Sequence, residues 1–138
     1  MSAYLAQLAA DRYEIADALH RFAFGLDHGD ADSLASTLTE DCVLDFRPAG
    51  KKLGLDFPKL TGRQAIVLAQ HFMPRQGPKP GAENALLMNR YDCELTRDRD
   101  KWRFKRMMID NAWAQGNPEI LNALAEHRLL SAKSKSPK

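Results

Sequence analysis

The sequence predicts a single α+β domain in which helices come first and antiparallel strands follow. Apolar residues recur at helical spacing early in the chain, whereas two later stretches alternate apolar and polar residues as paired strands do. The chain has 138 residues, 44% of them hydrophobic, which is enough for one buried core. A curled sheet that closes on an N-terminal helix would leave a pocket between the two.

Composition and charge argue against several classes of protein. The net charge is +2, and basic residues gather only in Lys101–Arg106 and Lys133–Lys138, so nucleic-acid binding is not predicted. No apolar run reaches the length of a membrane span, and Met1–Leu5 lacks the features of a secretory signal. The four histidines and two cysteines have no metal-ligand spacing. We expect a cytoplasmic protein without cofactor or metal, with one domain over residues 1–130 and a disordered basic tail over residues 131–138.

The first two elements are predicted to be helices. Asp11-Arg-Tyr-Glu14 resembles a capping box, and the apolar residues after it predict a helix over Asp11–Leu26. Asp27 follows about 100° further round the helix, where it is expected to border the core. Asp30 is expected to cap a second helix over Ala31–Leu38.

The middle of the chain is predicted to contain a short strand, a loop and the start of a helix. Cys42–Phe46 alternates as a strand, with Asp45 on the face opposite to Phe46. Glycines and prolines predict a loop over Pro48–Leu60, and Thr61–Gln64 is a second capping-box pattern. The following stretch, Ala65–Met73, fits a continued helix and a buried strand equally, because periodicity does not distinguish them in so short a run.

The C-terminal half is predicted to form an antiparallel hairpin of Ala85–Leu95 with Lys101–Ile109, which Asn111–Trp113 extends. A short terminal helix is expected after Pro118. Strict alternation would place one set of side chains of the first strand on one face: Ala85, Leu87, Asn89, Tyr91, Cys93 and Leu95. It would place Trp102, Phe104, Arg106 and Met108 together on the second strand. Cys42 and Cys93 are expected to be small core residues.

Several segments, taken in order, resemble the nuclear transport factor two superfamily, and within it the SnoaL-like and scytalone dehydratase branch. The resemblance runs roughly from Arg12 to Ile120 and implies a cone: a strongly curved, mainly antiparallel sheet packed on N-terminal helices. Its segments are Asp27–Asp30, Glu40–Phe46, Leu60–Ile66, Val67–His71, Tyr91–Leu95, Lys101–Phe104 and Trp113–Pro118.

The resemblance also implies a site and reveals a gap in it. In the dehydratase branch an acid ends the first helix and two histidines project from the sheet; Asp27 matches the acid and His71 the second histidine. The first histidine is absent, because Ile66 and Leu68 are nearly adjacent where family members continue through further strand. Part of the usual sheet would then be missing, by natural deletion or by alteration of the chain. Phe46 stands where scytalone dehydratase has a tyrosine.

Two functions follow from this resemblance. The first is a small cofactor-free lyase (a dehydratase) or isomerase acting on a small hydrophobic molecule, with His71 as the acid–base group and Asp27 orienting it. The second is a non-catalytic module for ligand binding or dimerisation. The family suggests a homo-oligomer, either a dimer or a trimer. The candidate substrate-binding residues, which fit core packing or mutual hydrogen bonding as well, are Phe24, Phe46, Asn89, Tyr91 and Trp113.

Overall fold

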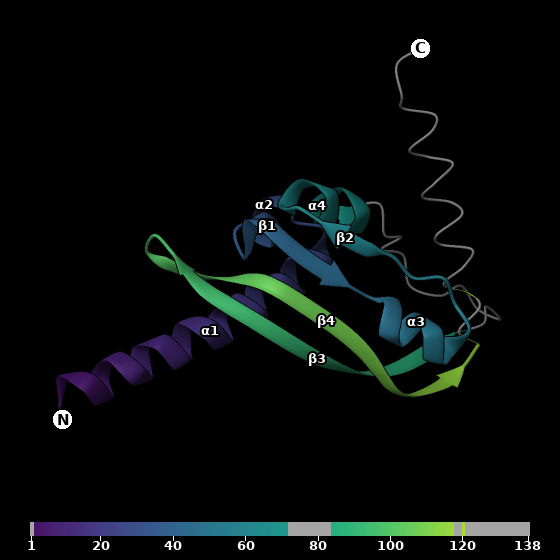
Figure 1. The fold of residues 1–138 in the computed structure, drawn as a ribbon, viewed down its shortest axis with the longest axis horizontal. Coiled ribbons are helices and arrows are strands. Elements are labelled where there is room, and N and C mark those ends of the chain that lie inside the picture. Colours follow the sequence, from purple (N-terminus) through teal and green to yellow (C-terminus); the bar gives the residue numbers. More distant parts are fainter. Residues whose placement is uncertain (1, 72–83, 118–119, 121–138) are drawn as a thin grey trace, which may run out of the picture.

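The structure, a computed structural model, describes residues 2–71, 84–117 and 120. The predicted terminal helix after Pro118, apart from Ile120, and the predicted tail over residues 131–138 lie outside the described residues. Four helices and four strands are described, in the order shown in Figure 1: α1 (Ala3–His28), α2 (Ala31–Ala35), β1 (Leu38–Asp45), α3 (Arg47–Leu53), β2 (Lys59–Thr61), α4 (Arg63–His71), β3 (Ala85–Asp98) and β4 (Lys101–Gly116).

The four described strands form one open sheet in the order β2–β1–β4–β3. The β3–β4 pair is the predicted antiparallel hairpin, with β4 extended through Asn111–Trp113 as expected. The β1–β2 pair is antiparallel, whereas β1 and β4 are parallel, which the sequence did not predict. The α+β class is therefore confirmed, with N-terminal helices on a mixed sheet that does not close.

The core begins where α1 crosses the β3–β4 hairpin and extends along β1 and β4 to α3 and α4. Figure 1 shows α1 crossing the hairpin there, while the other end of the two strands continues to α3. Phe22 of α1 meets Phe104 of β4 edge-on, with ring centroids 5.7 Å apart. Cys42 is buried in this core and Cys93 packs against it, as expected. The buried core residues are Ala18, Phe22, Leu34, Leu38, Cys42, Leu44, Ala49, Ile66, Phe104, Met107 and Ile109.

Two irregularities in the hairpin change which side chains share a face. Glu94 pairs with Arg106 and Leu95 with Phe104, so the register skips Lys105; a second shift skips Ala112. A bulge of this kind inserts one residue into a strand and breaks the alternation of its side chains. Phe104 and Met107 are consequently both buried, although strict alternation had placed them on opposite faces. That part of the prediction is wrong beyond Lys105.

α1 begins earlier than predicted. Its cap is Ser2, whose hydroxyl accepts a hydrogen bond from the Leu5 amide at 3.2 Å, and the helix starts at Ala3. Asp11 is therefore not a cap. It accepts hydrogen bonds from Arg97 at 2.6 Å and from the Trp102 indole at 3.2 Å, and so ties α1 to the turn end of the hairpin.

Three further boundaries differ from the prediction, while the cap of α2 is confirmed. Asp30 accepts a hydrogen bond from the Ser33 amide at 3.0 Å, but α2 ends at Ala35 and Leu38 already belongs to β1. The expected loop contains a helix, α3. Pro48 does not prevent this helix, because it stands in the first turn, where a missing N–H costs nothing. The end of that loop pairs with β1 as β2.

No helix among the described residues is both long and apolar enough to cross a membrane.

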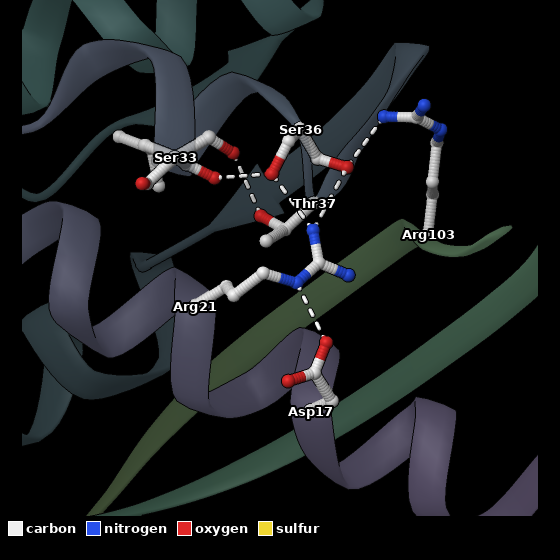
Figure 2. A network of polar contacts seen from close by, with 7 residues as sticks. Asp17, Arg21, Ser33, Ser36, Thr37 and Arg103 are labelled. Carbon is white, nitrogen blue, oxygen red and sulfur yellow. Dashed lines mark hydrogen bonds and ion pairs between the residues drawn. The ribbon is translucent and has the colours of Figure 1, made fainter.

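The junction of α2 and β1 is held by polar contacts to both α1 and β4 (Figure 2). Arg21 of α1 binds Asp17 at 2.8 Å and donates to the Ser36 hydroxyl at 2.7 Å. Arg103 of β4 donates to the carbonyl oxygen of the same serine. Buried Thr37 donates its hydroxyl proton to the Leu34 carbonyl at 2.7 Å. One turn of chain thereby fixes the end of α1 relative to the sheet.

Candidate functional site

The predicted acid, Asp27, lies on the exposed side of α1, one residue before the helix ends. At about 100° per residue it is roughly opposite to the buried side of the helix, which Ala18, Phe22 and Gly25 define. Asp27 therefore does not border the described core, contrary to the expectation. Asp27 lies beside the short connection to α2. Helix α2 itself packs against both α1 and α4.

The predicted histidine, His71, is the last residue of a helix. α4 runs without interruption from Arg63 to His71, so the helix is the correct one of the two alternatives for this segment, and His71 does not project from the sheet as the resemblance implied. Helical spacing explains how α4 packs: Ile66 is fully buried and Val67 packs on the core, whereas Leu68 is exposed. The capping-box pattern before the helix was the more reliable of the two local signals.

Beyond the apolar core, the inner face of the sheet carries three polar side chains: Asn89, Tyr91 and Asn111. Directly opposite residues on paired strands point to the same face. Asn89 is opposite Asn111, and Tyr91 is opposite buried Ile109, so all three lie on the core side of the sheet. They occupy the part of the hairpin that continues past α1. We take this group as the candidate site and call it the polar cluster.

Asn111 is the fixed point of the polar cluster, being 5% exposed. Its side-chain nitrogen donates to the Met88 carbonyl at 3.2 Å, to the Trp113 carbonyl at 3.0 Å and to the Asn89 side-chain oxygen at 3.0 Å. The skipped residue Ala112 interrupts the ladder at this point, and the amide of Asn111 donates to backbone carbonyl oxygens of both strands, at the residue pair just beyond the bulge.

Tyr91 is the titratable member of the polar cluster. Partial burial raises the pKa of its phenol, and a hydrogen bond with the Asn89 side chain opposes that rise. The side chain is still 48% exposed, so the phenol can meet a ligand. A neutral phenol at physiological pH serves as a hydrogen-bond donor to an oxygen atom, and is too weak an acid to protonate most leaving groups unaided.

α3 supports this end of the sheet from the side. β1 pairs with β4 only as far as Asp45 and Met108, and the next residues of β4 run alongside α3 instead. Lys52 of α3 binds the Asp110 carboxylate at 2.8 Å and donates to the backbone carbonyl of Asn111 at 3.2 Å. This lysine therefore occupies the edge of the strand that β1 leaves unpaired. The sequence prediction missed both Lys52 and Asn111; a buried asparagine in a strand was the available signal for the second.

The three aromatic candidates lie in three different places. Phe24 is exposed and stacks on His28, with ring centroids 4.2 Å apart. Phe46 precedes α3 and packs against the core, edge-on to Phe57. Trp113 pairs with Met88, which alternates with Asn89, so the indole lies on the face opposite to the polar cluster. Of the three, only Phe46 packs against the core that Asn89 and Tyr91 adjoin.

A separate depression of about 660 Å³ lies at the turn end of the hairpin and is wide open to solvent. The residues that line it are all polar or charged, whereas pockets for hydrophobic ligands are enclosed and lined mostly by apolar side chains. Neither the polar cluster nor the acid–base candidates contribute to it, and the described residues contain no group of three side chains suited to hold a metal ion. The depression is lined by Thr39, Glu40, Asp41, Thr96, Arg97 and Asp98.

Helices packed on an open, curved sheet, with polar side chains beyond the core, place the chain in the class of nuclear transport factor two-like folds. A hexachlorocyclohexane dehydrochlorinase is similar, with a TM-score of 0.65 and 14% identity over 83% of this chain and 93% of that chain. A putative scytalone dehydratase from Novosphingobium aromaticivorans has a TM-score of 0.61 and 15% identity, covering 80% and 90%. A nuclear transport factor two-like protein with a cystatin-like fold from the same organism scores 0.59 at 16% identity, covering 88% and 93%. At these identities the likeness shows the fold alone.

Within that class, residues 7–72 match the model of the SnoaL-like domain. The terrestric acid biosynthesis cluster protein E of Penicillium crustosum is 25% identical, in a match that covers 78% of this chain and 87% of that protein. The predicted resemblance to SnoaL-like proteins is thus confirmed. The matched segment includes Asp27 and His71, whereas the polar cluster lies outside it.

Proposed function

We propose that this protein is a small cofactor-free lyase or isomerase that acts on a small hydrophobic molecule bearing a carbonyl group. The observation that carries the proposal is the polar cluster: Asn89 and Tyr91 stand beside the apolar core on its own face of the sheet. An apolar surface with a few convergent polar groups is the usual form of a small-molecule site. The SnoaL-like match and the dehydratase and dehydrochlorinase folds among similar structures support the same class of reaction.

In this proposal His71 is the acid–base group and Asp27 orients it or raises its basicity. The base removes a proton from the carbon next to the carbonyl group. The hydroxyl group on the neighbouring carbon is protonated and leaves as water. Asn89 and Tyr91 would donate hydrogen bonds to the carbonyl oxygen, where negative charge develops. Both acid–base candidates stand at the C-terminal ends of helices that contact α2, which is consistent with a shared site.

The test is the dehydration of a bicyclic β-hydroxyketone, 3-hydroxy-1-tetralone, to 1-naphthol, followed by absorbance. We expect His71→Ala to lower kcat/KM by about a hundredfold or more, the usual scale for a lost acid–base group. Asp27→Asn should lower it as well and leave the melting temperature unchanged, since Asp27 is exposed. Two exposed residues provide matched controls: His20→Ala and Asp32→Asn should retain parent activity. Full activity in both test variants would refute the pair.

A non-catalytic module for binding or dimerisation is the second candidate, favoured by a different observation. Leu86, Met88 and Trp113 are each about half exposed, and they lie on the sheet face opposite to the polar cluster. Exposed apolar side chains gathered on one face are typical of surfaces that associate. Two results would favour this function. The first is a sedimentation coefficient that rises with protein concentration, as expected for a dimer or a trimer. The second is a melting temperature that an aromatic ketone raises although the protein shows no turnover.

A further inference from the structure

The orientation of the Asn111 amide follows from its surroundings. The nitrogen and oxygen of an asparagine side chain are told apart by their hydrogen-bond partners. Two of the partners here are the backbone carbonyl oxygens of Met88 and Trp113, which only accept. The atom that faces them must therefore be the nitrogen. The bulge that skips Ala112 thus determines how this buried side chain is turned.

The orientation of Asn89 follows in turn. Its side chain lies 3.0 Å from the same Asn111 nitrogen, which is a donor, so the atom that Asn89 presents must be its oxygen. The NH₂ group of Asn89 then points away from Asn111. The oxygen of Asn89 is held by Asn111, so the NH₂ group of Asn89 is the part that remains to donate to the Tyr91 phenol, with which this side chain forms a hydrogen bond. A phenol that accepts this bond keeps its own proton for another acceptor.

We infer that Asn111 is a positioning residue, which turns Asn89 so that Asn89 and Tyr91 form a pair of donors for one acceptor oxygen of a ligand. The inference rests on the proposed function in taking the polar cluster as the ligand site, and it adds the ligand's chemistry. A carbonyl or enolate oxygen suits two donors, whereas a group that offers only a proton meets the donor end of the Asn89 amide. The selectivity of the cluster is thus set by a residue that is itself almost completely buried.

Two probes of nearly the same shape separate hydrogen bonding from apolar contact: 2-acetylnaphthalene has a carbonyl oxygen, and 2-isopropylnaphthalene has a methyl group in its place. Their dissociation constants are measured by fluorescence titration of the full-length protein. We expect the parent to prefer the ketone by about tenfold, the scale of one to two net hydrogen bonds. Because binding is measured without turnover, a protein that prefers the ketone but has no lyase activity would refute the proposed function and leave this inference intact.

Two variants test the roles of the asparagines. Asn89→Asp keeps the oxygen that accepts from Asn111 and loses the NH₂ donor, so the preference for the ketone should disappear. Asn111→Ser removes the nitrogen that holds Asn89, and here too the preference should fall to about one while affinity for the hydrocarbon is kept. If the role of Asn111 were merely structural, Asn111→Ser would weaken the binding of both probes by the same factor. Tyr91→Phe should lower the preference in part, because one donor remains.

A measurement on the parent keeps the inference testable if Asn111→Ser fails to fold. The side-chain amide signals of Asn89 and Asn111 are followed by ¹H–¹⁵N NMR during titration with 2-acetylnaphthalene. The Asn89 signal should shift and the Asn111 signal should stay in place. The inference is overturned if only the Asn111 signal shifts, if Asn111→Ser folds and keeps the full preference, or if the parent binds the two probes equally or binds neither.

Discussion

Gly25→Ala is the sharpest test of how α1 is seated. Added at this glycine, a Cβ atom would lie 2.7 Å from the Leu34 backbone nitrogen and 2.9 Å from the Leu34 Cβ atom. Two opposing terms follow: alanine gains about 1 kcal/mol of helix propensity over glycine, and overpacking of a close contact costs about 1–3 kcal/mol. Since the contact is with backbone, α2 has to move, so the overpacking cost lies in the upper part of its range, at about 2–3 kcal/mol, and we expect a net loss of about 1–2 kcal/mol.

At this chain length such a loss lowers the melting temperature by roughly 3–8 °C, which calorimetry or circular dichroism resolves. The control is Ala23→Gly, an exposed site in the same helix, where only propensity acts and about 1 kcal/mol should be lost. Packing thus predicts that both substitutions destabilise, whereas propensity alone predicts opposite signs. A Gly25→Ala protein that melts above the parent would refute the argument that the close approach of α2 requires a glycine.

Two further predictions concern pH. Hydrogen bonds from Gln7 to Asp11 and from Lys52 to Asp110 hold the pKa of each carboxyl below its ordinary value. The stability that these two carboxylates contribute is therefore present above about pH 4, and it is lost as the pH falls through their lowered pKa values in the folded protein. Urea unfolding at pH 7 and pH 3 should show this loss, and a smaller one for Asp11→Asn. Burial raises the pKa of the Cys42 thiol to about 11, so unfolding releases a proton between about pH 9 and 11, and the free energy of unfolding should fall by about 2–3 kcal/mol across that range. Cys42→Ala should lack this alkaline component, and an identical pH dependence in that variant would contradict it.

The sequence by itself determined the features that depend on local periodicity. The apolar spacing around Phe22, the Asp30 cap and the alternation of Ala85–Leu95 each act within a few residues, and each appears in the structure where it was predicted. Together they determined the α+β class. The ordered segments that resemble SnoaL-like proteins had the same local origin, and the SnoaL-like domain model matches residues 7–72.

Only the tertiary structure decided how these elements meet. The parallel pairing of β1 with β4 joins segments far apart in sequence, and no local pattern encodes which strands become neighbours. The bulges at Lys105 and Ala112 bend the long hairpin, and by shifting alternation they bury Met107 and turn Trp113 to the far face. The polar cluster arises from the second of these bulges. Asn111 became its fixed point because the folded backbone, rather than any motif, places two carbonyl oxygens beside its amide.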